Sequence, residues 1–165
     1  MYQNVKEIEL IKNALLNEKE GEKFYLLAAE AAQDESAKKA FMFLAEEEVK
    51  HGEWLYHIYR KLINEKQFSL DEIYEAEESS PQIFTEKTQH PESGSLDVSV
   101  FGIGVKMEKA SIDYYKNAAQ TTEIKELKNF YQRLVEWEVI HLNMLEKIYE
   151  GLKEEWWQKQ GFSPA

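Results

Sequence analysis

Apolar residues recur at helical spacing over four long stretches of the chain. The first stretch covers residues 5–32, and the second runs to about residue 64 after Asp34 and Ser36, which offer a turn and an N-cap. A third stretch covers residues 96–120, and a fourth runs from Thr121 or Thr122, either of which suits an N-cap, to about residue 152. The pattern therefore predicts four long amphipathic helices.

The segment between the second and third helices, residues 65–95, has a different composition. It contains Pro81, Pro91 and Gly94 with several Ser and Glu, and only residues 70–76 have a brief helical pattern. We interpret it as a crossover between two antiparallel helix pairs, which predicts an all-α four-helix bundle in one domain, residues 1–165. The C-terminal tail, with Trp156, Trp157 and Phe162, is expected to pack back on the bundle.

The chain is an internal repeat, because adding 90 to a residue number in the first helix pair reaches a matching residue in the second. The halves cover about residues 5–64 and 96–152. Between residues 41–59 and 131–149, eight of nineteen positions are identical, and the first and third helices share further identities. The repeat predicts two halves related by a pseudo-twofold axis. The first members of the identical pairs are Glu18, Lys19, Tyr25, Ala28, Ala29, Leu44, Glu46, Glu48, Val49, His51, Leu55, Ile58 and Tyr59.

Polar residues interrupt the apolar seam of each helix at equivalent points. In the second helix the seam is Phe41, Leu44, Glu48, His51, Leu55, Ile58 and Leu62. The fourth helix repeats it as Tyr131, Leu134, Glu138, His141, Leu145, Ile148 and Leu152, and the first and third helices carry Glu18 and Glu108. A Glu and a His one turn apart thus occupy positions where a core needs apolar side chains.

Four buried carboxylates need a strong compensating charge, and no Lys or Arg lies in the seams. Two divalent cations would balance four glutamates, and the imidazoles would complete the ligand set without adding charge. Carboxylates with a minority of imidazoles favour iron, with manganese as the alternative. A single Glu-x-x-His is usually accidental, but its duplication predicts a dimetal site; the alternative is a bundle that has lost its metal. The predicted ligands are Glu18, Glu48, His51, Glu108, Glu138 and His141.

Composition excludes several other functions. The net charge of −11 argues against nucleic acid as a partner, because phosphate-binding surfaces use Lys and Arg. The absence of cysteine excludes disulfides, thiolate zinc sites, iron–sulfur clusters and a Cys nucleophile. No run reaches the roughly 18 apolar residues of a membrane span, and the N-terminus does not have the pattern of a signal peptide. A cytoplasmic protein is expected.

Four motifs carry a resemblance to a known family: EKEGEKFY at residues 18–25, EVKH at 48–51, EKASIDYY at 108–115 and EVIH at 138–141. Together they resemble the rubrerythrin-related diiron proteins of the ferritin-like superfamily. The resemblance implies that Glu48 and Glu138 bridge two irons and that Glu18 and Glu108 are terminal ligands. Classical rubrerythrins add a cysteine-ligated rubredoxin domain, so electrons would come here from a separate donor protein. Ser111 replaces a second Glu of the family's third helix, which leaves a more symmetrical, bacterioferritin-like ligand set.

Three functional hypotheses follow. The leading one is an oxidoreductase, expected to be a homodimer, that reduces hydrogen peroxide or dioxygen with electrons from an external donor. The second is a ferroxidase or iron-storage protein, which would need a cage-forming assembly, and the third is a bundle that metal merely stabilises.

Several other polar and aromatic residues of the sequence have two interpretations. Tyr25 and Tyr115 are interpreted either as core tyrosines or as hydrogen-bond donors to ligand carboxylates. Glu22 is expected at the periphery, and His57 and His90 in solvent. Trp137 is expected to pack at the bundle edge, and Trp54, Trp156 and Trp157 are explained equally well by an oligomer contact or by ordinary packing.

Overall fold

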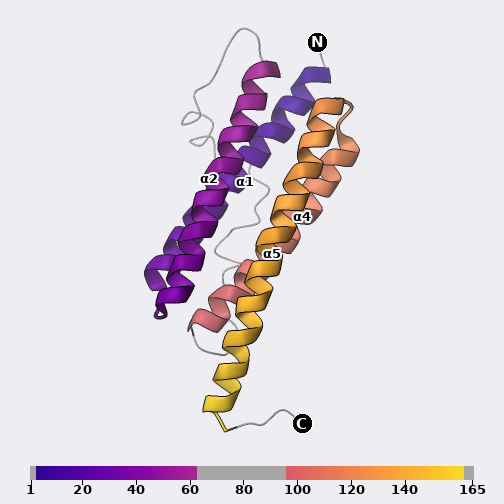
Figure 1. Ribbon diagram of the computed structural model, residues 1–165. Helices are drawn as coiled ribbons and strands as arrows, with labels where there is room; N and C mark the ends of the chain where they lie inside the picture. The colour runs from indigo at the N-terminus through magenta and orange to yellow at the C-terminus, as the bar shows by residue number, and fades with distance from the viewer. Residues whose placement is uncertain (1–2, 63–95, 162–165) are drawn as a thin grey trace.

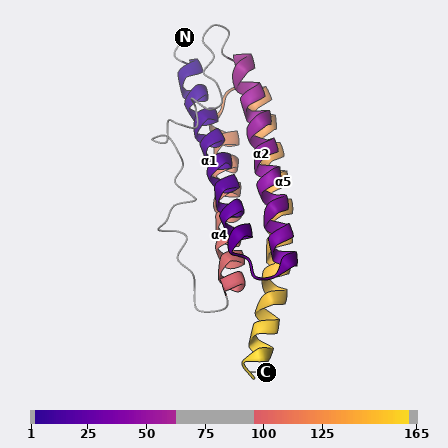
Figure 2. The same cartoon turned by 90° about the vertical axis from the view of Figure 1, so that its left-hand side faces the viewer.

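The computed structural model describes residues 3–62 and 96–161, and these form the four predicted helices. In chain order the helices are α1 (Gln3–Ala31), α2 (Glu35–Leu62), α4 (Leu96–Thr121) and α5 (Lys125–Lys159). α1 packs along α2 and α4 along α5, so that two antiparallel pairs lie side by side (Figures 1 and 2). The all-α, ferritin-like four-helix bundle predicted from the sequence is confirmed. The expected crossover, including its helical pattern and His90, lies outside the described residues.

The short connection between α1 and α2 contains the predicted cap of α2, which is Asp34; Ser36, the other residue that the sequence offered, already lies in the first turn of the helix. Asp34 directly precedes α2, and its carboxylate Oδ2 accepts a hydrogen bond from the backbone N–H of Ala37 at 2.8 Å. This bond satisfies one of the N–H groups that the first turn of a helix leaves without a backbone partner. The antiparallel pairing of α1 and α2 is therefore fixed locally.

The predicted cap of the last helix is wrong. The N-cap of α5 is Ile124, which is in extended conformation and makes no side-chain cap hydrogen bond. Thr122 instead donates its hydroxyl to Glu7 Oε2 at 2.8 Å and accepts from the Ile124 N–H at 3.2 Å. Its hydroxyl thus links the α4–α5 connection to α1 by a hydrogen bond. The local sequence pattern cannot predict this contact, because the two residues lie far apart in the sequence.

The end of α5 also differs from the prediction, because the helix continues from residue 152 to Lys159 and projects beyond the other helices (Figure 1). Trp156 and Trp157 lie in this extension and contact each other at 5.1 Å between ring centroids, and Trp157 is exposed. The expectation that these two residues pack back on the bundle is wrong. The helix meets no strong breaker before Gly161, whose φ of 75° is in the left-handed region. Phe162 lies outside the described residues.

The core has two apolar clusters with a polar layer between them. One cluster centres on Phe41, Leu44, Phe101 and Leu145. The other contains Ile11, Leu15, Leu55, Tyr115 and Leu134. Each fully buried large side chain contributes about 1.5 to 3 kcal/mol. The two clusters hold the helices on either side of the polar layer, which places that layer in a rigid, closed environment.

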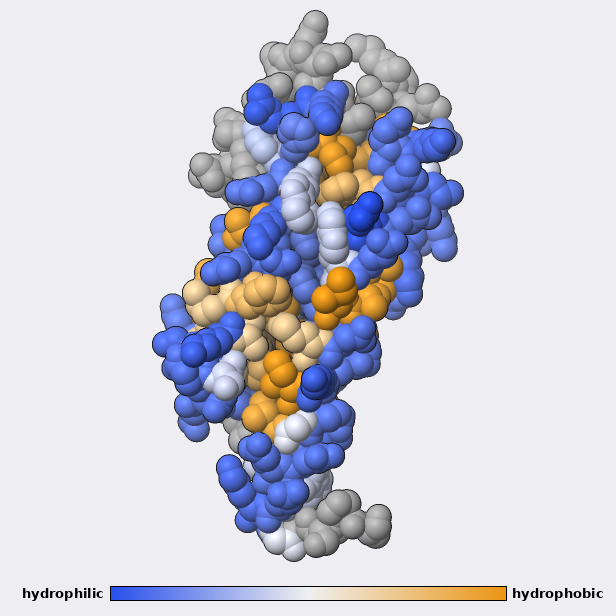
Figure 3. Space-filling view, viewed as in Figure 1, coloured by the Kyte–Doolittle hydropathy of each residue, from blue (hydrophilic) through white to orange (hydrophobic). Residues whose placement is uncertain are grey.

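Hydrophilic residues cover most of the face shown in Figure 3, and apolar side chains gather along its middle, over α2 and α5. No helix among the described residues has the length and apolar character needed to span a membrane.

Candidate metal centre

All six predicted ligands lie in the polar layer between the two apolar clusters. α1 contributes Glu18, α4 contributes Glu108, and α2 and α5 each contribute one Glu-x-x-His pair. Every one of these side chains is buried, with at most 4% of its surface exposed. A spacing of three residues places Glu and His one turn apart on the same helix face, so both side chains point into the core. The juxtaposition predicted from the sequence is present; metal binding by these residues stays a prediction.

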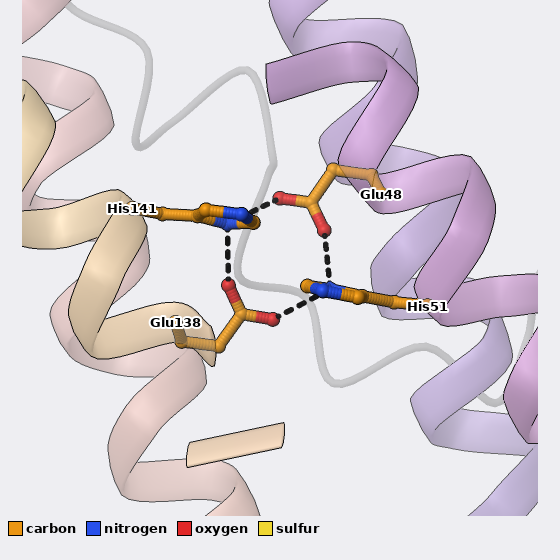
Figure 4. Close-up of side chains that lie close together, drawn as sticks. All are labelled: Glu48, His51, Glu138 and His141. Carbon is orange, nitrogen blue, oxygen red and sulfur yellow. Dashed lines mark hydrogen bonds and ion pairs between the residues drawn. The ribbon is translucent and has the colours of Figure 1, made fainter. Parts of the chain in front are cut away.

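The two Glu-x-x-His pairs form a compact group (Figure 4). One candidate ligand atom from each of Glu48, His51, Glu138 and His141 lies within 4.8 Å of the others. His141 Nδ1 lies 3.0 Å from Glu138 Oε2 and 3.9 Å from Glu48 Oε1. His51 Nδ1 lies 3.3 Å from Glu48 Oε2 and 3.2 Å from Glu138 Oε1. Carboxylates and imidazoles therefore alternate around a common centre.

Glu18 and Glu108 flank this group and are held by tyrosines of the opposite helix pair. Tyr115 of α4 donates its hydroxyl to Glu18 of α1, and Tyr25 of α1 donates its hydroxyl to Glu108 of α4. The hydrogen bonds that the sequence indicated for Tyr25 and Tyr115 are thus present. They cross between the halves instead of running along one helix, so each tyrosine fixes the carboxylate contributed by the other repeat. Glu18 Oε2 also lies 3.1 Å from His51 Nδ1.

Burial dominates the protonation of the glutamates. It raises the pKa of Glu18, Glu48 and Glu108, and the neighbouring charge of Glu138 raises all three further. For Glu138 burial acts in the same direction, but hydrogen bonds from His141 and His51 outweigh it and lower the pKa of Glu138. The centre therefore holds one carboxylate whose ionisation its neighbours favour and three whose ionisation burial opposes.

The histidines have the complementary behaviour. Burial alone would lower the pKa of His51, but hydrogen bonds to Glu138, Glu18 and Glu48 raise it well above its ordinary value. The pKa of His141 is raised in the same way, against burial, by its hydrogen bond to Glu138. In the metal-free protein, protons on the two histidines thus supply positive charge beside the buried carboxylates.

Hydrogen-bond donors are too few for the acceptors at this centre. Three carboxylate oxygens, from Glu18, Glu48 and Glu138, lie within 3.3 Å of the single nitrogen His51 Nδ1, which carries at most one proton. Glu138 Oε1 is buried without a well-formed hydrogen bond among the described residues. Divalent cations would remove this shortage, because one cation accepts lone pairs from several oxygens and nitrogens at once. The four carboxylates and two imidazoles thus fit two metal ions.

Glu22 and His57 lie apart from the centre. Glu22 is partly buried and pairs with Lys19 Nζ at 2.6 Å, and His57 is exposed, as the sequence predicted for both. Ser111 lies beside the centre, where Asn17 Nδ2 donates to Ser111 Oγ at 3.2 Å and to the Tyr115 hydroxyl at 3.2 Å. Asn17 was not predicted from the sequence, because an isolated seam Asn has no repeat partner: the equivalent residue is Met107.

The position of Trp137 was predicted only in part. It is partly buried at the edge of the bundle, as expected, but its indole also stacks on the His51 imidazole, with 5.3 Å between centroids and 14° between planes. The sequence could have indicated this contact, because Trp137 directly precedes Glu138 and lies on the α5 face next to α2.

Comparisons with known proteins agree with this architecture. A protein from Pyrococcus furiosus described as hypothetical shares 23% identity, with a TM-score of 0.68 over 89% of this chain and 90% of that chain. An uncharacterized conserved protein from Magnetospirillum magnetotacticum shares 19% identity, with a TM-score of 0.66 over 88% of this chain and 94% of that chain. At these identities the likeness establishes the fold. No curated protein matches the chain. The family model described as rubrerythrin matches residues 9–149, and the chain therefore belongs to the rubrerythrin family.

Proposed function

We propose that this chain is a diiron oxidoreductase that reduces hydrogen peroxide, or dioxygen, with electrons from an external donor protein. The observation that carries the proposal is the buried set of four glutamates and two histidines, in which three carboxylate oxygens surround the one nitrogen His51 Nδ1. Membership of the rubrerythrin family, whose members are diiron proteins, supports iron over manganese.

The six residues would have different roles in binding the ions. His51 and His141 would bind through Nδ1, the nitrogen that already faces the carboxylates, and must lose the protons that the metal-free centre retains there. Glu48 and Glu138 lie centrally enough to serve both ions, and Glu18 and Glu108 flank them. Tyr115 and Tyr25 would hold these outer carboxylates in place through the crossed hydrogen bonds.

When bound, two ferrous ions supply one electron each, so that hydrogen peroxide takes up two electrons and two protons and forms two molecules of water. The protein's own contribution is a closed site: the ligands are nearly inaccessible to solvent and lie between two apolar clusters. Such a site restricts which molecules approach the ions. Two electrons must then return from the external donor before the next peroxide is reduced.

One observation favours a second candidate, a ferroxidase that oxidises ferrous ion for storage. Ser111 stands where the family resemblance leads one to expect an additional glutamate, so the six ligands are symmetrical between the repeats. Storage requires a closed assembly with an interior, whereas an oxidoreductase needs none. A dimer in solution, together with peroxide consumption that continues as long as reductant is supplied, would exclude storage.

The testing experiment is metal content after anaerobic loading with ferrous ion, followed by a peroxide assay with excess reductant. The wild type should bind two irons per chain, and Glu48→Ala and Glu138→Ala should bind fewer. Glu22→Ala is the matched control, because Glu22 is a helical glutamate of α1 that pairs with Lys19 outside the centre. It should keep both ions. Absence of metal from the wild type would refute the proposed centre, and two irons without peroxide turnover would refute the proposed reaction.

A further inference from the structure

A row of stacked aromatic rings leads from the candidate metal centre to the protein surface. The imidazole of His51 stacks on the indole of Trp137, with 5.3 Å between centroids and 14° between planes. Trp137 in turn contacts the indole of Trp54, with 4.5 Å between centroids and 35° between planes, and the Trp54 indole also lies 5.9 Å from the His51 ring. Trp137 is partly buried and Trp54 is 41% exposed. The rings therefore connect a buried candidate ligand to solvent without an aliphatic residue between them.

The row continues inward to the second histidine, because the His51 and His141 rings stack at 5.2 Å with 16° between their planes. At the outer end, Trp54 and Trp137 line a groove of about 510 Å³ between α2 and α5. Its other lining residues include His57, Ile58, Phe130 and Arg133. An external molecule seated in this groove would touch the outermost indole directly.

The internal repeat shows that the two tryptophans have no equivalents beside His141. The residues equivalent to Trp54 and Trp137 are Met144 and Glu47. Glu47 forms an ion pair with Lys50 at 2.5 Å, so the equivalent position near His141 carries a charged surface contact instead of an indole. The four glutamates, two histidines and two tyrosines of the centre are the same in both halves, whereas the two tryptophans are not.

We propose that Trp137 and Trp54 form the path by which electrons enter the metal centre, from a one-electron redox protein docked at the groove. The inference rests on the proposed function. Transfer of an electron through protein weakens steeply with the gap between donor and acceptor, and π-systems in contact couple the two more strongly than empty space does. In each transfer the donor loses one electron and the metal pair gains one, and the indoles are neither oxidised nor reduced. Two transfers replace the two electrons that one peroxide consumes.

The plain alternative is that the two indoles only cover His51 and exclude water. If the indoles only cover His51, replacing them should change the stability and metal occupancy of the centre, whatever the position from which an electron is injected. If they form an electron path, replacing them should slow the reduction of the metal only for electrons injected at the groove. The two roles are therefore distinguishable by moving the point of electron injection.

The absence of cysteine allows a ruthenium bipyridine photosensitiser to be attached at one chosen position. His57→Cys places it in the groove, and Lys116→Cys places it at an exposed position on α4. Flash reduction of the oxidised, iron-loaded protein is then followed by absorption in three backgrounds: wild type, Trp137→Phe and Trp54→Phe. Trp156→Phe, in the pair at the end of α5, is the matched control.

From the groove label, Trp137→Phe and Trp54→Phe should each slow reduction severalfold, because the smaller phenyl ring leaves a wider gap between the groove and His51. From the Lys116→Cys label neither should change the rate, and Trp156→Phe should change neither. Equal slowing from both labels, or no slowing from the groove, would overturn the path. Trp54→Phe decides the question if Trp137→Phe loses metal, because Trp54 is the more exposed of the two. Flash reduction needs no peroxide, so failure of the peroxidase proposal would be seen separately.

Discussion

Tyr25→Phe isolates one hydrogen bond of the proposed metal centre without disturbing the core. The Tyr25 ring is fully buried and packs against Phe24 and Phe41, at 5.1 and 6.3 Å between centroids, and a phenylalanine ring keeps both contacts. Only the hydroxyl that donates to Glu108 is lost. The fold should therefore survive while Glu108 becomes free to rotate away from the ions.

Two independent arguments give similar magnitudes. Loss of a residue that orients a metal ligand costs about 10- to 100-fold in affinity, or about 1.4 to 2.7 kcal/mol. A hydrogen bond to a charged group contributes about 1.5 to 3 kcal/mol, and the Glu108 carboxylate is charged when it binds metal. We therefore expect ferrous ion to bind Tyr25→Phe one to two orders of magnitude more weakly than the wild type. Tyr115→Phe, which releases Glu18, should have a similar effect.

The assay is anaerobic titration with ferrous ion, with circular dichroism to verify the helices. Tyr131→Phe is the matched control, because the Tyr131 hydroxyl is buried without a hydrogen-bond partner among the described residues and its repeat equivalent is Phe41. It should bind iron as tightly as the wild type. Unchanged affinity in Tyr25→Phe, or an equal loss in Tyr131→Phe, would refute the reasoning.

Three further predictions concern stability. Removal of metal with a chelator should lower the free energy of unfolding, by about 2.7 kcal/mol relative to protein with free metal at 100 times its dissociation constant, as thermal melts would show. In the metal-free protein the pKa values of three glutamates and two histidines are raised, so above the ordinary glutamate pKa of 4.5 the folded state binds more protons than the unfolded state; these residues are Glu18, Glu48, Glu108, His51 and His141. The free energy of unfolding should therefore fall as pH rises through neutrality. Urea melts in chelator at several pH values measure it, and a rise with pH would contradict the prediction. Asp34→Ala removes the cap of α2 and should cost about 1 kcal/mol, measured by urea unfolding against Glu35→Ala as control.

The sequence was sufficient for the fold and for the inner part of the site because both depend on periodicity. A step of three or four residues fixes which side chains share a helix face, and the shift of 90 places Glu48 and Glu138 at the same depth of one core. The burial of all six candidate ligands follows from these two patterns. No assumption about loop structure is needed.

The sequence could not predict contacts that depend on how the α1–α2 pair and the α4–α5 pair lie against each other. Tyr25 lies seven residues after Glu18 on one face, yet it bonds Glu108 across the bundle. Thr122 has the composition of an N-cap but donates to Glu7, more than a hundred residues away. The extension of α5 was missed because Gly151 weakens a helix without ending it, and no other breaker follows before Gly161.

The two halves of the repeat are alike in what would touch metal and different in what surrounds it. Each half supplies two glutamates, a histidine and a tyrosine that holds a glutamate of the other half. Around this common set, the Asn17 side chain donates to the tyrosine bonded to Glu18, whereas the side chain of the equivalent Met107 has no N–H, and the indoles beside His51 have no equivalents beside His141. The surroundings of the two candidate histidines are therefore chemically unequal although the candidate ligands are the same. On the proposed function, the duplicated residues would hold the metal pair, and the differences around them would set the side from which electrons arrive, because the two indoles lie beside His51.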